Sequence, residues 1–272
     1  MNIDFHSHST CSDGALTPAE LVERAGAQGV TALSITDHDT VAAYGQEGMD
    51  TFGVELIPGV EFSTRWQGKG VHVVGLNIDP QSRVIAEGVA LHRAARAARA
   101  AKIAERLEKR GLSGCLEGAR ALAGDAAVGR PDFARFLVAA GHVPSVEAAF
   151  KQYLGDGKVG DVREHWADLA EVIRWIREAG GIAVLAHPLK YGLTRSKLKR
   201  LLEAFIAAGG EGLEVVSGQQ VRRCTQDLGR LCRELGLLAS RGSDFHAPGA
   251  PWAELGRVPE LPADVTPVWD AF

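Results

Sequence analysis

The sequence predicts an α/β protein in which parallel strands alternate with helices. Short apolar or β-branched runs recur along the chain, most of them separated by amphipathic helical stretches, at residues 3–5, 32–36, 54–57, 71–78, 182–186, 212–216 and 237–240. Such alternation implies right-handed crossovers between parallel strands. The pattern by itself is compatible with an open doubly wound sheet and with a closed barrel.

Composition excludes several classes of protein. The 272 residues suffice for one full core, and 46% of them are hydrophobic, but no apolar run reaches the roughly 18 residues of a membrane span. The start, MNIDFHSHST, lacks the basic and apolar regions of a signal peptide, so we expect a cytoplasmic protein. A net charge of −4 provides no broad positive field for long duplex nucleic acid. No feature indicates an obligatory protein partner.

The cysteines are scattered along the chain and have no CxxC spacing: Cys11, Cys115, Cys224 and Cys232. This distribution argues against both a disulfide framework and a cysteine zinc site. We therefore expect reduced thiols.

The first helix has clear boundary signals. Thr17 is a suitable N-cap, Pro18 suits the first helical position, and Glu20 places an acid in the first turn. Gly26 and Gly29 indicate where the helix ends.

One segment departs from the alternation. Residues 81–159 contain no convincing strand but include a long Ala/Arg-rich helix and further helical pieces. We interpret this segment as an inserted helical subdomain, and residues 1–80 with 160–272 as the main domain.

Two residue pairs indicate metal binding. His6 and His8 are two positions apart, so on an extended strand both imidazoles lie on the same face, about 6.5 to 7 Å apart along the chain. Asp244 and His246 repeat this spacing directly after the apolar run at 237–240. Either pair alone would have an ordinary explanation as exposed polar residues. Together they predict ligands that converge.

Further candidate ligands lie at or after other predicted strands: Asp13, His38, Glu61, His72 and His187. The carboxyl ends of strands in α/β proteins converge on one mouth, where sites are built. Imidazole and carboxylate ligands without thiolates suit zinc, manganese or iron(II), and nine ligands are enough for two or three ions. Clustered divalent ions suit phosphoryl transfer, because they acidify a water nucleophile and neutralise developing charge.

These residues resemble the polymerase and histidinol phosphatase (PHP) family. Its four motifs correspond here to His6-Ser7-His8 with Ser12-Asp13-Gly14, to Thr36-Asp37-His38-Asp39, to Ala186-His187-Pro188 and to Ser243-Asp244-Phe245-His246. The resemblance spans the chain. It implies a distorted seven-stranded (β/α)7 barrel with a trinuclear metal site, and so favours the barrel over the open sheet.

The resemblance also implies a distribution of ligands among the ions. The first ion would be bound by His6, His8, Glu61 and Asp244, the second by Asp13, His38 and His246, and the third by Glu61, His72 and His187. We expect Asp13, His38 and His246 to contact the substrate as well and to serve as the catalytic residues. One of the flanking acids, Asp37 or Asp39, would orient the imidazole of His38.

The insertion and the phrase Gly129-Arg130-Pro131-Asp132 are similar to one branch of the family, which contains nucleoside 3′,5′-bisphosphate phosphatases and exonucleases of the RNase AM type. The resemblance implies that a metal-bound hydroxide attacks the 3′-phosphate of a nucleoside 3′,5′-bisphosphate such as pAp. Alternatively, it implies hydrolysis of short 5′-phosphorylated RNA or DNA that proceeds from the 5′ end. Arg99, Lys102 and Arg130 would bind the 5′-phosphate. Asp132 departs from the branch, where histidine is frequent.

Other interpretations remain open from the residues. Most of the basic residues of the long helix suit a solvated face as well as a phosphate site. A phosphatase for a small metabolite such as histidinol phosphate would use the same metals without a basic helix, and a non-catalytic metal-binding module would need no substrate site. His92, His142 and His165 lie outside the motifs, and we do not expect them to be ligands.

Overall fold

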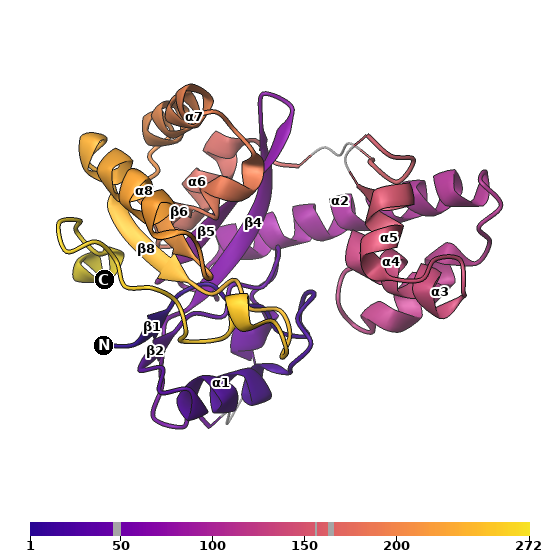
Figure 1. Ribbon diagram of the computed structural model, residues 1–272, viewed down its shortest axis with the longest axis horizontal. Helices are drawn as coiled ribbons and strands as arrows, with labels where there is room; N and C mark the ends of the chain where they lie inside the picture. The colour runs from indigo at the N-terminus through magenta and orange to yellow at the C-terminus, as the bar shows by residue number, and fades with distance from the viewer. Residues whose placement is uncertain (46–49, 156, 163–165) are drawn as a thin grey trace. The chain divides into compact units, whose positions relative to one another are not determined.

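The computed structural model describes residues 1–45, 50–155, 157–162 and 166–272, which form two compact units (Figure 1). Residues 1–89 and 167–272 form one, here called the sheet unit, and residues 90–166 form the other, here called the helical unit. These divisions lie seven to nine residues beyond the expected limits of the insertion, 81 and 159. The independence of the insertion as a subdomain stays a prediction.

The sheet unit contains two sheets. In the first, β1 (Ile3–Asp4), β2 (Ala32–Leu33) and β3 (Glu55–Leu56) are parallel. In the second, the order is β4 (Gly59–Trp66), β5 (Lys69–Leu76), β6 (Ile182–Leu185), β7 (Gly212–Ser217) and β8 (Leu238–Gly242). Strand β5 is antiparallel to both of its neighbours. The prediction of a wholly parallel set of strands is therefore wrong for β5.

Strand β4 was absent from the sequence prediction. It forms a hairpin with β5, in which Trp66 pairs with Lys69 across a two-residue turn. Gln67 and Gly68 have φ angles of 47° and 80°, and positive φ at both turn positions is typical of the tight hairpin turn that matches strand twist. Glu61 consequently lies within a strand and not after one.

Backbone hydrogen bonds join the three-stranded sheet to the two edge strands of the five-stranded sheet, β4 and β8. After β1 and β8, the N–H of Asp244 donates to the carbonyl of His6 at 2.8 Å, and that of His8 to Phe245 at 2.9 Å. After β2, the N–H of Asp39 donates to the carbonyl of Glu61 in β4 at 2.9 Å. The α/β class is confirmed, but the described strands form sheets of three and five and not one regular seven-stranded barrel.

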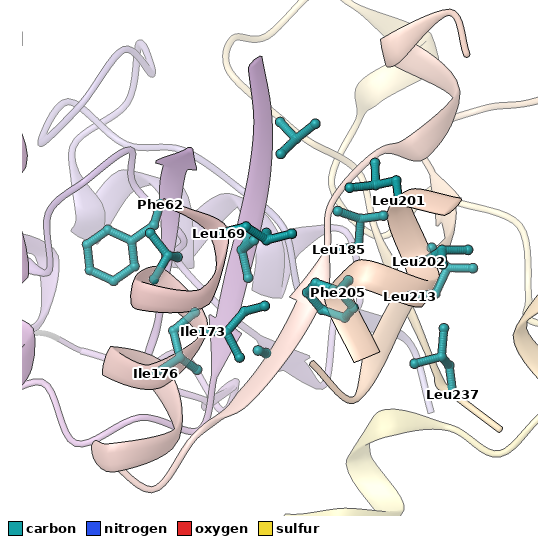
Figure 2. Close-up of a cluster of buried hydrophobic side chains, with 14 of the residues drawn as sticks. Phe62, Leu169, Ile173, Ile176, Leu185, Leu201, Leu202, Phe205, Leu213 and Leu237 are labelled. Atoms are coloured by element: carbon teal, nitrogen blue, oxygen red, sulfur yellow. The ribbon is translucent and has the colours of Figure 1, made fainter. Parts of the chain in front are cut away.

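Helices α6 (Leu169–Glu178), α7 (Arg195–Ala207) and α8 (Arg222–Glu234) pack on the five-stranded sheet. Figure 2 shows side chains of α6 and α7, among them Ile173, Ile176 and Phe205, facing Leu185 of β6 and Leu213 of β7. Burial of each such side chain contributes about 1.5 to 3 kcal/mol. This core fixes the backbone from which the site residues project.

The remaining elements of the sheet unit are short or peripheral. Helix α1 (Pro18–Ala27) begins as expected, because Thr17 and Glu20 form a reciprocal capping box with Pro18 at the helix start. The other elements are single turns: η1 (Ala42–Gly45), η3 (Pro188–Tyr191), η4 (Pro251–Ala253) and η5 (Val268–Ala271).

The helical unit contains most of α2 (Arg83–Glu108) together with α3 (Cys115–Ala123), α4 (Arg130–Ala139), α5 (Val146–Ala149) and η2 (Phe150–Leu154). Its own apolar core includes Ile103, Leu107 and Phe133. Among the described residues, no helix is both long enough and apolar enough to cross a membrane. All four cysteines are free thiols, as expected.

Candidate metal centre

Nine predicted ligands gather in the sheet unit. Most come from the segments that follow β1, β2, β6 and β8, whereas Glu61 and His72 project from within β4 and β5. Within groups of three or four, their ligand atoms all lie within 4.8 Å of one another, and together these groups include His6, His8, Asp13, His38, Glu61, His72, His187, Asp244 and His246. The site is thus assembled from residues up to 240 positions apart in the chain.

Glu61 lies at the middle of this cluster and is fully buried. Its Oε1 atom is 2.9 Å from both His72 Nδ1 and His187 Nε2. Its Oε2 atom is 3.1 Å from His38 Nδ1 and 3.3 Å from the Nε2 atoms of His6 and His8. One carboxylate therefore faces five imidazoles, which suits a ligand shared between two ions.

Asp244 and Asp13 flank opposite sides of His8. Asp244 Oδ1 lies 3.3 Å from His8 Nε2 and 3.5 Å from His6 Nε2. Asp13 Oδ1 lies 3.8 Å from His8 Nδ1 and 3.3 Å from His246 Nε2, and its Oδ2 lies 3.9 Å from His38 Nε2. The three ligand groups implied by the resemblance are thus each close together in space.

Burial differs across the cluster. The side chains of His6, His8 and Glu61 are at most 1% exposed, whereas those of Asp13 and His246 are 20% and 37% exposed. Asp13 and His246 therefore lie on a side of the cluster that is open to solvent, and His72, at 31%, is partly exposed as well.

Among the described residues, several buried ligand atoms of the cluster have no hydrogen-bond partner: His6 Nε2, both ring nitrogens of His8, His38 Nδ1 and Glu61 Oε2. Unsatisfied buried polar atoms are rare in folded proteins and need an explanation. A carboxylate surrounded by lone-pair nitrogens is the donor set that divalent cations prefer. The residues present therefore fit a bound metal cluster.

The pKa shifts of the cluster residues also favour the binding of cations. Burial opposes the charge on Asp13 and Glu61, yet the surrounding imidazoles hold the pKa of both carboxyls well below its ordinary value. Burial lowers the pKa of His8 to about 3 and that of His187 to about 4, and it also lowers that of His38. At neutral pH these imidazoles are neutral, as metal ligands must be.

His6 differs from these histidines because of Glu214, a buried residue of β7 that sequence reasoning missed. Burial opposes a charge on His6, but Glu214 and Glu61 outweigh it and raise the pKa of His6 to about 10. Glu214 Oε1 is 2.9 Å from His6 Nδ1, and its Oε2 accepts the backbone N–H of His187. Glu214 thus orients two candidate ligands at once. An acid within the apolar run at 212–216 was the signal that could have revealed it.

The acids that flank His38 have other partners. Asp37 accepts hydrogen bonds from the hydroxyls of Ser9 and Ser12, both at 2.5 Å. Asp39 accepts from the backbone N–H of Ser63 at 2.7 Å and from its hydroxyl at 3.0 Å. Both carboxylates hold the loops around the cluster, and these bonds give no support to the prediction that one of them orients His38.

The predicted phosphate-binding residues lie in the helical unit, where each has a neighbour within that unit. Arg99 lies 5.9 Å from the ring centre of Trp166, Arg130 donates to the carbonyl of Leu154 at 3.2 Å, and Lys102 bonds to Glu105 at 2.6 Å. Asp132, the acid found where the branch frequently has histidine, has a structural role. It accepts the N–H of Gly129 at 2.7 Å and so caps α4. Of the three histidines set aside, His92 is fully buried beside Trp166 and His142 is exposed, while His165 lies outside the described residues.

A family model described as the PHP domain matches residues 4–181. The chain belongs to the PHP family. The resemblance drawn from the four motifs is thereby confirmed, and the motifs around His187 and Asp244 lie beyond the matched segment.

Full-length relatives of this PHP chain include enzymes of two names. A 5′-3′ exoribonuclease from Haemophilus influenzae is 45% identical, with 99% of this chain and 98% of the relative covered. A 3′,5′-nucleoside bisphosphate phosphatase from Chromobacterium violaceum is 40% identical, with 98% and 95% covered. Both matches extend across the insertion as well as the sheet unit.

Two solved structures also have a fold similar to that of this chain. A protein from Chromobacterium violaceum, described as an amidohydrolase with bound sulfate and no metal, has a TM-score of 0.92 at 40% identity, over all of this chain and 95% of its own. A metal-dependent phosphoesterase from Bifidobacterium adolescentis has a TM-score of 0.82 at 29% identity, over 98% and 93%. The PHP-type α/β fold is thus shared with both.

Proposed function

We propose that this chain is a metal-dependent phosphoesterase that hydrolyses the 3′-phosphate of nucleoside 3′,5′-bisphosphates such as pAp. It also removes nucleotides from the 5′ end of short 5′-phosphorylated oligonucleotides. The observation that carries the proposal is the cluster of imidazoles and carboxylates in which, among the described residues, several buried ligand atoms have no hydrogen-bond partner. Full-length relatives named for both activities support it.

The two activities require the same bond cleavage. In each, water attacks a phosphorus atom and the bond from that phosphorus to the 3′ oxygen of a 5′-phosphorylated nucleotide breaks. The substrates differ only in whether the phosphorus carries a further nucleotide. One site can therefore serve both if the mouth admits the longer chain.

Two or three divalent ions, with manganese as the first candidate, are the cofactors in this proposal. When bound, they would lower the pKa of a water nucleophile and neutralise charge on the phosphoryl oxygens. His6, His8, Glu61 and Asp244 would hold one ion, and the more exposed Asp13, His38 and His246 a second. His72 and His187 would complete a third site with Glu61.

The residues of the chain have separate roles in this reaction. Asp13 and His246, on the solvent-exposed side of the cluster, would contact the phosphoryl group together with His38. Glu214 holds the imidazole of His6 and the backbone of His187 in place. We assign binding of the 5′-phosphate to Arg99, Lys102 and Arg130, and Lys102 would exchange Glu105 for the phosphate.

Release of phosphate from the monoesters, and of 5′-mononucleotides from RNA, tests this function with added manganese. The substrates are a nucleoside 3′,5′-bisphosphate, the matching 3′-monophosphate and a short 5′-phosphorylated RNA. We expect kcat/KM to be at least about tenfold higher with the 5′-phosphate, because a charge-assisted contact contributes about 1.5 to 3 kcal/mol. Equal rates on all three, or a higher rate on histidinol phosphate as a fourth substrate, would instead indicate a small-metabolite phosphatase. No turnover of any phosphate ester would indicate a binding module.

A further inference from the structure

A lysine that none of the predicted roles uses reaches the metal cluster. Lys190 lies on η3, the turn that follows His187, and its ammonium bonds to Oδ2 of Asp244 in the loop after β8. The other oxygen of the same carboxylate, Oδ1, faces the ring nitrogens of His6 and His8 at 3.5 and 3.3 Å. Asp244 thus has one oxygen toward the candidate ligands and one toward Lys190.

The backbone around Lys190 is fixed on both sides. Pro188 begins the turn, and the N–H of Lys190 donates to the carbonyl of His187 at 3.0 Å. The next residue, Tyr191, is buried, and its hydroxyl accepts the N–H of His72 at 2.9 Å and donates to the carbonyl of Ala186 at 2.8 Å. Lys190 therefore extends from a turn that hydrogen bonds hold to His72 of β5 and to Ala186, the residue before His187.

Exposure separates Lys190 from its partner. The side chain of Lys190 is 57% exposed, whereas that of Asp244 is 6% exposed. An ammonium has three N–H donors and no acceptor, so one donor can stay on Asp244 while two remain for another anion. The cation lies at the rim of the cluster, one carboxylate away from the candidate ligands.

We propose that Lys190 binds a non-bridging oxygen of the phosphoryl group that is transferred. Its ammonium keeps one hydrogen bond to Asp244 and directs the others to the phosphate, adding a positive charge supplied by the chain itself. The inference rests on the proposed function, because it concerns the same substrate class at the same site. It differs from the 5′-phosphate assignment, which concerns another phosphate and other residues.

The test measures binding of inorganic phosphate, the product analogue, by calorimetry on the manganese-loaded protein, together with kcat and KM for the bisphosphate. Lys190→Met keeps most of the stem and removes the charge, Lys190→Arg restores a cation, and Lys199→Met changes an exposed lysine of α7 as the matched control. We expect Lys190→Met to weaken phosphate binding about ten- to hundredfold. Lys190→Arg should recover part of that loss, and Lys199→Met should match the parent.

Metal content, measured on the same samples, separates phosphate binding from mere support of Asp244. The proposal requires Lys190→Met to retain the metal content of the parent protein. It is overturned if the variant loses manganese, or if the metal-loaded variant binds phosphate as tightly as the parent. Because phosphate binding needs no turnover, a parent protein that binds phosphate through Lys190 but hydrolyses no substrate would overturn the proposed function while showing that Lys190 contacts phosphate.

Discussion

The cluster of candidate metal ligands in the sheet unit and the basic residues of the helical unit are both charged sets, but they differ in how their polar atoms are satisfied. In the cluster, buried nitrogens and a carboxylate oxygen have no hydrogen-bond partner within the part of the chain that the structure describes. In the helical unit, Lys102 and Lys109 are exposed and both bond to Glu105, while Arg106 and Arg130 donate to backbone carbonyls.

The difference decides how strongly each set indicates a ligand. Buried polar atoms without partners cost free energy, so a fold that retains them is built for a group that satisfies them. Exposed cations with partners cost little and are compatible with a plain solvated surface. The cluster therefore indicates bound metal by itself, whereas the assignment of the 5′-phosphate site depends on experiments.

Loss of a ligand on the exposed side of the cluster should have the largest effect. We expect Asp13→Ala and His38→Ala to reduce phosphate release to background, because each removes a ligand and a phosphoryl contact, while the thermal unfolding midpoint stays close to that of the parent. Chelation should abolish activity and added manganese restore it. His142→Ala, which changes an exposed histidine of the helical unit, is the control. An active, metal-replete Asp13→Ala protein would contradict the ligand assignment.

The next effect concerns the support of the cluster. Glu214→Gln keeps the shape of the side chain but removes the charge beside His6, so metal affinity should fall about 10- to 100-fold, as for other residues that orient metal ligands. Metal titration of the variant measures this, and Glu211→Gln on the exposed surface is the matched control. If Glu214→Gln binds metal like the parent, Glu214 has only a packing role.

The sequence predicted the ligands better than the strands that carry them. The pairs His6/His8 and Asp244/His246 are local patterns, and their side chains converge although all four residues lie just beyond β1 and β8. Strand β4 escaped prediction although its apolar and polar residues alternate from Val60 to Trp66, because Pro58-Gly59 directly before it is a pair typical of turns and loops. Glu214 escaped because its partners, His6 and His187, are 208 and 27 residues away.

The 5′-phosphate assignment can be tested against the cluster with paired substrates. We expect Arg99→Ala and Arg130→Ala to raise KM for the bisphosphate about ten- to hundredfold, as loss of a charged hydrogen bond implies. Turnover of the 3′-monophosphate should not change, because that substrate lacks the 5′-phosphate. Arg110→Ala, at an exposed position of the helical unit, is the control. Equal losses on both substrates would indicate damage to the fold and not a 5′-phosphate site.

We expect the smallest effect, a small loss of stability, when one ion pair is removed from each unit in turn. Arg24 of α1 binds Glu254 through two hydrogen bonds, at 2.9 and 2.6 Å, whereas Glu105 is exposed beside its lysines. The hydrogen bond from Arg24 lowers the pKa of Glu254 below 4.5, so its stabilising effect is present above pH 4.5 and is lost as the pH falls through the lowered value. Glu254→Gln should therefore cost up to about 1 kcal/mol at pH 7. Below that lowered value the difference from the parent should vanish.

Urea unfolding at several pH values measures this, and Glu105→Gln should leave the midpoint unchanged. If Glu105→Gln lowered the unfolding midpoint more than Glu254→Gln does, the comparison would be reversed. The exposed cations of the helical unit would then contribute to stability.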